Sequence, residues 1–186
     1  MKNKTPFQYS KIGSLLKKVI HTKIGAKIAY YSGLSGFNKL EVLVNGKSIG
    51  ASYNSRVDKG AALTASLLAG SSLGSITSPL PPLYVALSTS SLTPAKGDTT
   101  LSGETSASGL ARALGTAGTY TAPSVIDGAA SYIVSKTFTS GATATIVSAA
   151  LFDAASVGNM FVEANLSASA SVVSGDTLTI NWTINL

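Results

Sequence analysis

A run of short strands separated by turn residues constrains this chain more than any other feature. From residue 83 onward, stretches rich in β-branched and aromatic residues alternate with Gly, Asp and Ser breaks at roughly ten-residue spacing. Such a series is typical of an antiparallel sandwich or barrel. We therefore predict a mainly β fold, an antiparallel β-sandwich or jelly roll, with strands over residues 83–87, 110–114, 132–138, 143–152, 160–166 and 177–186.

The last of these stretches alternates most regularly. Successive side chains of a strand point to opposite faces, so one face takes the Thr and Asn residues. The other face takes Leu178, Ile180, Trp182 and Ile184. Because Trp182 is the only tryptophan and lies on the apolar face, we predict that it is a core anchor.

The chain before residue 83 combines a hairpin with a helix. Asn45-Gly46 is the strongest two-residue hairpin signal, because both turn positions need a positive φ. Asp58 can cap a helix over the Ala- and Leu-rich residues that follow, and Gly70 can end it. Prolines between residues 71 and 82 predict a linker. We divide the chain into a basic N-terminal arm and hairpin region (1–53), a helix and Pro-rich linker (54–82) and a β-sandwich domain (83–186).

The composition is poor in charge. Charged residues make up 12% of the chain, about half the usual share. A free monomer normally needs a charged surface to stay soluble, so this surface suits a protein covered by neighbours. A neutral secreted β domain is the alternative. No apolar run reaches the length of a membrane span, and the N-terminal lysines precede no signal-type apolar region. We expect no membrane partner and no secretory export.

The net charge of +6 is distributed unevenly. Residues 1–60 hold eleven of the fourteen basic residues and two acids, whereas residues 61–186 hold three basic residues and six acids. Within the first part, residues 11–20 predict a short amphipathic helix with Ile12, Leu15, Leu16 and Val19 on one face. Residues 23–30 then alternate as a half-buried strand would.

A basic arm can bind nucleic acid, an anionic membrane or an acidic protein surface, or it can be a solvated face without a partner. The residues before position 61 contain ten lysines and one arginine, a poor ratio for bidentate base readout. We expect a protein partner, with DNA as the less favoured alternative. The residues predicted to dock are Lys11, Lys17, Lys18, Lys23 and Lys27.

No constellation of residues predicts catalysis. His21 is the only histidine, lies in the basic arm, and has no nearby acid and nucleophile of the kind a triad needs. The absence of cysteine excludes thiolate metal sites and cysteine nucleophiles. Asp98, Glu104 and Asp127 could bind calcium between loops, but acids in loops are more often solvated turn residues. We therefore predict no enzyme activity, no catalytic residue, no metal site and no cofactor.

Several segments together resemble the virion structural proteins of tailed bacteriophages, of the tail-fibre, head-fibre or capsid-decoration type. The similarity runs from about residue 54 to the C-terminus. The shared motifs occur in a fixed order: a short helix, a loop, a strand that contains an aromatic residue and "AL", a Thr/Pro-rich stretch, "L..E" and an arginine. The matching segments are "DKGAALTASLLAG", "PPLYVALSTSSLTPAKGDTTLSGE", "GLARALGT", "AALFDAASVGNMFVEANLS" and "VVSGDTLTINWTINL".

This resemblance implies a β-sandwich in a virion assembled in the host cytoplasm. It implies a non-enzymatic structural role as a surface or appendage component that binds copies of itself, a trimer by analogy, and other capsid or tail proteins. A carbohydrate- or receptor-binding module, with Tyr120 and Tyr132 as candidate platforms, is one alternative. An internal protein that contacts DNA through the basic arm is another.

Overall fold

The computed structural model describes residues 37–73, 76, 80–118, 120–122 and 130–186. The expected strand over residues 23–30 and helix over residues 11–20 lie outside this part of the chain. The elements are β1 Phe37–Val44, β2 Lys47–Ser55, α3 Asp58–Ala69, β3 Tyr84–Ser88, β4 Ala113–Leu114, β5 Thr116–Ala117, β6 Ser131–Thr139, β7 Ala144–Phe152, β8 Met160–Val172 and β9 Thr177–Asn185.

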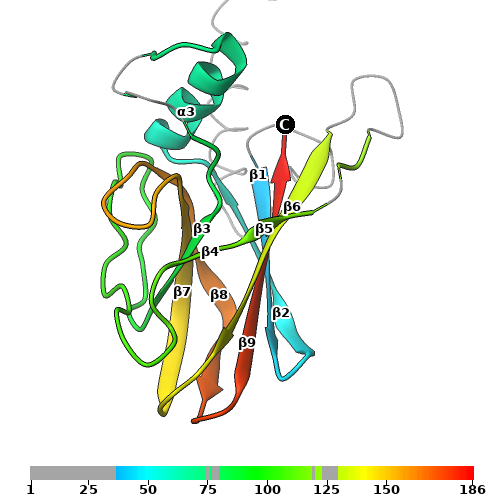
Figure 1. Cartoon of the computed structure of the whole chain (residues 1–186), viewed down its shortest axis with the longest axis vertical. Coiled ribbons are helices and arrows are strands. Elements are labelled where there is room, and N and C mark those ends of the chain that lie inside the picture. The colour runs from blue at the N-terminus through cyan, green and yellow to red at the C-terminus, as the bar shows by residue number, and fades with distance from the viewer. Residues whose placement is uncertain (1–36, 74–75, 77–79, 119, 123–129) are drawn as a thin grey trace, which may run out of the picture.

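The strands form two antiparallel sheets packed face to face (Figure 1), which confirms the predicted mainly β sandwich. The five-stranded sheet has the order β2-β1-β9-β6-β5, and the four-stranded sheet has the order β4-β3-β7-β8. Helix α3 lies across one end of the sandwich, the end at which β9 and the C-terminus finish. The edge strands β2 and β8 meet at one side of the sandwich, where Asn54 Nδ2 donates to the carbonyl of Glu163 at 2.6 Å.

The hairpin signal at Asn45-Gly46 is confirmed. The two residues have φ values of 48° and 76°, and β1 pairs with β2 on either side of them. The hairpin does not stand apart from the sandwich, however. Strand β1 also pairs along its length with β9, from Lys39 opposite Thr183 to Val44 opposite Leu178. Residues 37–55 are therefore part of the five-stranded sheet, a long-range pairing that the sequence does not reveal.

Helix α3 begins and ends close to the predicted residues. Gly70 adopts the left-handed conformation that ends it, with a φ of 62°. Val57, not Asp58, occupies the N-cap, and no side chain caps the first turn. The expected cap at Asp58 is therefore wrong by one position, since Asp58 lies inside the first turn, where its charge still favours the helix dipole.

The region around Leu114 differs from the expected strand over residues 110–114. Ala113–Leu114 pairs with β3 in the four-stranded sheet, whereas Thr116–Ala117 pairs with β6 in the five-stranded sheet. The chain thus crosses between sheets at Gly115, whose N–H donates to the carbonyl of Leu83 at 2.8 Å. A side chain at residue 115 would meet the carbonyl of Ser135 at 2.9 Å, so glycine suits this crossing.

The core lies between the two sheets and is formed by the alternate residues of each strand. Trp182 is fully buried at its centre, on β9 between Leu40 of β1 and Val134 of β6. From the four-stranded sheet, Val85, Leu87, Ile146, Leu151 and Val162 pack against the same cluster. Burial of this apolar surface is the main stabilising contribution to such a fold.

Candidate interaction surfaces

The outer face of the four-stranded sheet is covered by the long connection between β3 and β4, residues 89–112, here termed the covering loop. Leu101 of this loop packs with Ala150, Phe152 and Met160 in a second apolar cluster, separate from the main core. Leu92 also packs against this cluster. In Figure 1 the loop runs beside β7. This face of the sandwich is therefore closed by the chain itself.

Polar side chains of the sheet fix the backbone of the covering loop. The Asn165 side chain accepts from the N–H of Leu92 and donates to its carbonyl, each at 2.8 Å. Ser148 Oγ donates to the carbonyl of Ser90 at 2.8 Å. Ser88 Oγ donates to the carbonyl of Ser102 at 2.5 Å. These buried and half-buried groups find their hydrogen-bond partners in the loop, so the loop is an integral part of the fold.

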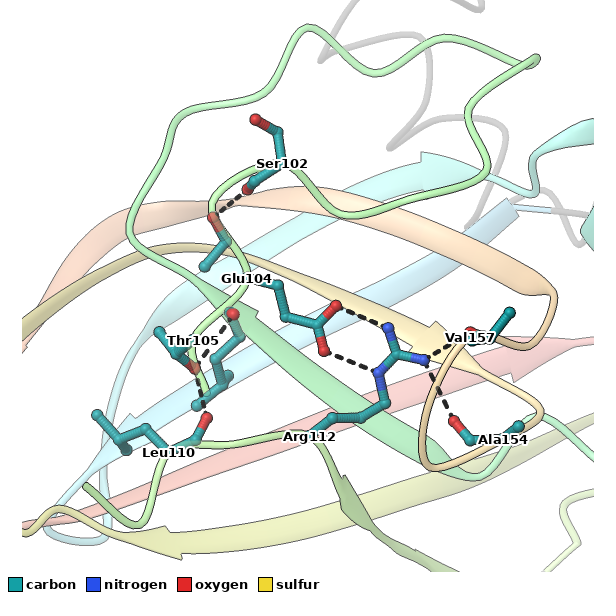
Figure 2. A network of polar contacts seen from close by, with 9 residues as sticks. Ser102, Glu104, Thr105, Leu110, Arg112, Ala154 and Val157 are labelled. Carbon is teal, nitrogen blue, oxygen red and sulfur yellow. Dashed lines mark hydrogen bonds and ion pairs between the residues drawn. The ribbon is translucent and has the colours of Figure 1, made fainter. Parts of the chain in front are cut away.

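Arg112 joins the covering loop to the connection between β7 and β8 (Figure 2). Its Nε and Nη2 donate to the two carboxylate oxygens of Glu104 at 2.8 and 2.6 Å. Its Nη1 donates to the carbonyls of Ala154 and Val157 at 3.2 and 2.9 Å. The guanidinium carbon lies 3.5 Å from the centre of the Phe152 ring, within range of a cation–π contact.

This arrangement gives the "L..E" and arginine motif a structural explanation. Leu101 fills the second apolar cluster, and Glu104 and Arg112 form the bidentate ion pair. Only 9% of the Arg112 side chain is exposed, and its donors are directed at groups of this chain. Arg112 therefore positions two loops, and is not free to contact a ligand.

A pair of acids joins the covering loop to β8. Glu163 of β8 is only 2% exposed, and its carboxyl group shares a hydrogen bond with Asp98 of the loop. Burial raises the pKa of Glu163 to about 8, and the bond to Asp98 adds to the shift. The same bond, with the N–H of Ala95, lowers the pKa of Asp98. At neutral pH Glu163 is therefore mostly protonated and donates to the Asp98 carboxylate.

The acids considered for calcium binding do not come together. Glu104 pairs with Arg112, and Asp98 pairs with Glu163. Asp127 lies outside the described residues. Across residues 37–73, 76, 80–118, 120–122 and 130–186, no group of three or more His, Cys, Asp or Glu side chains is placed to hold a metal ion.

The outer face of the five-stranded sheet is open along β9 and β6. Side-chain hydrogen bonds link β6 to β9 on this face: Ser135 Oγ donates to Asn181 Oδ1 at 2.7 Å, and the hydroxyls of Thr137 and Thr179 bond at 2.8 Å. On β1 the charges of Lys39 and Glu41 neutralise each other at 3.8 Å. The result is a mainly polar surface with little net charge, which also exposes Ile133, and a neighbouring molecule can pack over it without electrostatic repulsion.

A third surface is apolar and lies at the end of the sandwich that carries α3. Helix α3 buries Gly60, Leu63 and Ser66 against the sheets. On its solvent-facing side, Leu68 is 85% exposed and Leu67 is 38% exposed. Leu73, just beyond the helix, is 41% exposed. An apolar group of this kind is more often an interaction site than a solvated surface.

The residues singled out from the sequence fall in different places. The five predicted docking residues, Lys11, Lys17, Lys18, Lys23 and Lys27, lie outside the described residues, as does His21. Trp182 lies fully buried in the core. Tyr120 is 59% exposed. Tyr132 is largely buried near Arg56, and burial raises its pKa. No helix in the described part of the chain is long and apolar enough to cross a membrane.

The structure thus shows a β-sandwich with one face closed by its own loop, a mainly polar face on the other sheet and exposed leucines near α3. A comparison with known families identifies the kind of protein. The model of the podophage GP4 fiber I protein gp80 family matches residues 61–183, about two thirds of the chain. The chain belongs to this family, and it is a fibre-type structural protein of a phage virion. No curated protein and no solved structure matches it.

Proposed function

We propose that this chain is a non-enzymatic surface or appendage component of the virion, as a capsid decoration, a head fibre or a tail-associated protein. It assembles with copies of itself, as a trimer by analogy with fibres, and docks on other virion proteins through its basic N-terminal segment. The distribution of charge carries the proposal. Residues 1–36 contain seven lysines and no acid, whereas residues 37–186 contain seven basic residues and eight acids.

Two further observations support this role. The family match begins at residue 61, so the basic segment lies outside the part shared by the family and is free to determine where this member docks. The outer face of the five-stranded sheet, with its little net charge, and the exposed leucines near α3 suit contact between copies. A surface of low charge that is covered in the assembled particle needs no charged residues for solubility.

Charge reversal in the full-length chain tests the docking. The double variant Lys17→Glu/Lys18→Glu should lose binding to purified virion proteins, measured by co-sedimentation with particles that lack this component. Lys47→Glu/Lys96→Glu removes the same charge from exposed positions of the sandwich and is the matched control. Equal binding by both variants and the unchanged chain would contradict docking through the basic segment.

The same preparations separate the alternatives. A DNA-contacting role predicts binding to duplex DNA that falls steeply with salt, about tenfold or more over a fourfold increase. DNA binding of that kind, without binding to virion proteins, would overturn the proposal. Light scattering of the full-length chain at two salt concentrations tests self-assembly. A stable multimer at both salt concentrations supports self-assembly. A chain that is monomeric in solution and also binds the particle as single copies argues against self-assembly.

A further inference from the structure

The solvent-facing side of α3 carries a line of apolar residues, as is typical of a helix that packs against another element. Ala61, Ala65 and Leu68 are all exposed and follow one another at i, i+4 and i+7, the spacing of one helical face. Leu67 and Leu73 widen this strip at the end of the helix. From Gly60 to Ala95 the sequence has no charged residue, so the only charge on this helical face is that of Asp58 in the first turn. We refer to it as the α3 apolar strip.

Helix α3 is held from its other side. The N–H of Val57 donates to the carbonyl of Phe161 at 3.2 Å. Gly60 lies so close to that same carbonyl that a β-carbon there would come within 2.0 Å of the oxygen. Because this buried side fixes the helix on β8, the apolar strip is presented outward as a fixed surface.

The N-terminal segment enters the domain next to α3. It joins β1 at Phe37, and the neighbouring Asn38 accepts from the N–H of Asn185 at 3.3 Å. The carbonyl of Asn185 in turn accepts from Arg56 at 3.2 Å, and Arg56 donates to Thr64 of α3 at 2.7 Å. Two residues therefore bridge the start of β1 to the helix, and Figure 1 shows both at the same end of the sandwich.

The N-terminal segment contains one stretch with the matching pattern. Ile12, Leu15, Leu16 and Val19 occupy one face of the helix predicted over residues 11–20, and the lysines of that stretch lie off this face. Sixteen residues, 21–36, connect it to β1. They span up to about 50 Å when extended, so the stretch can reach any part of α3.

We propose that residues 11–20 pack their apolar face on the α3 apolar strip of the same chain. A tethered segment meets its own helix at an effective concentration on the order of millimolar. This favours the contact within one chain over the same contact between dilute copies. In this position Lys11, Lys17 and Lys18 point away from α3 and are displayed at that end of the sandwich. The inference does not depend on what those lysines bind.

Disulfide trapping tests the contact directly, because the chain has no cysteine of its own. In the full-length protein, Leu16→Cys/Leu68→Cys places both thiols at the proposed contact, within the short range that a disulfide requires. Mild oxidation should yield a cross-linked monomer without free thiols. The control Lys17→Cys/Leu68→Cys moves one thiol off the apolar face and should cross-link several-fold more slowly. Leu16→Cys/Val173→Cys uses an exposed position near the β1–β2 turn and should remain reduced.

Each other outcome overturns the proposal. Equal rates for the three pairs would mean that the segment samples the surface without packing on α3. Disulfides formed only between chains would identify a second copy as the occupant. A separate readout is trypsin cleavage after Lys17 and Lys18, which should accelerate several-fold in Leu68→Asp and not in Val173→Asp. Unchanged cleavage in Leu68→Asp would also contradict the contact.

Discussion

Arg112 and Glu104 form a two-bonded ion pair within the covering loop, at 2.8 and 2.6 Å. The guanidinium also donates to the β7–β8 connection, where Val157 has a φ of 55°. A β-branched residue is rarely found in that left-handed region, so the connection needs external support. Arg112 provides this support, and it keeps the covering loop in place at the same time.

Arg112→Ala should lower the free energy of unfolding by about 3 kcal/mol, because it leaves the Glu104 carboxylate without its partner and removes the donors to the β7–β8 connection. Urea unfolding measures the loss. The control is Lys96→Ala, which removes an exposed ion pair with Asp58 at 3.8 Å and should change stability by less than about 0.5 kcal/mol. Equal effects of the two variants would mean that Arg112 is not a structural residue.

Glu163 should make the protein less stable as the pH rises. Its pKa in the folded protein is about 8, above its ordinary value of 4.5, so the folded state binds more protons between these values. The contribution of Glu163 to stability is therefore fully present below about pH 4.5 and is lost as the pH rises through 8. We expect the free energy of unfolding to be lower at pH 9 than at pH 5 by more than about 1 kcal/mol.

Glu163→Gln isolates this effect, because the amide can still donate to Asp98 but does not ionise. The variant should have a nearly flat pH profile between pH 5 and 9 and should exceed the unchanged protein in stability at pH 9. His21 is present in both proteins and cancels in the comparison. Identical slopes for the two proteins would show that Glu163 does not carry the dependence.

The side chain of Trp182 fills the centre of the core, and no hydrogen-bond partner for its Nε1–H occurs among the described residues. Its contribution is therefore mainly apolar packing. Trp182→Ala should cost about 3–5 kcal/mol, since the surrounding strands cannot collapse into the cavity. Tyr120→Ala, at a 59% exposed position, is the control and should stay within about 0.5 kcal/mol of the unchanged chain. Thermal unfolding measures both.

The local parts of this fold could be predicted because their cause is local. The alternation of residues 177–185 fixes which face of β9 is buried, and Asn45-Gly46 fixes the turn of the first hairpin. Pairing between distant strands has no such signal. The sequence therefore predicts β1 outside the sandwich domain, although its partner β9 forms the middle of the same sheet.

The covering loop could not be predicted for the same physical reason. Its Ser, Thr and Gly content is typical of a solvated connection, and its anchors Ser148 and Asn165 lie 58 and 73 residues away from their partners. The sequence does contain one usable signal. Leucines are rare in this region, and Leu101 and Leu110 are both buried. Most of the Arg112 side chain is buried as well, whereas the other basic residue of the region, Lys96, is exposed.

Helix propensity and packing predict opposite effects of Gly60→Ala on the free energy of unfolding. Alanine favours a helix interior by about 1 kcal/mol over glycine, so propensity alone predicts that Gly60→Ala stabilises α3. The added β-carbon would lie 2.0 Å from the carbonyl oxygen of Phe161, however, and backbone atoms cannot move aside cheaply.

We therefore expect Gly60→Ala to lower the free energy of unfolding by about 1–3 kcal/mol, because α3 must shift away from β8. Ala61→Gly, at the adjacent exposed position, changes propensity without a clash and should cost only about 0.5–1 kcal/mol. Urea unfolding of both variants measures the difference. A gain in stability for Gly60→Ala would mean that α3 is not fixed on β8, and the outward presentation of Leu68 would lose its structural basis.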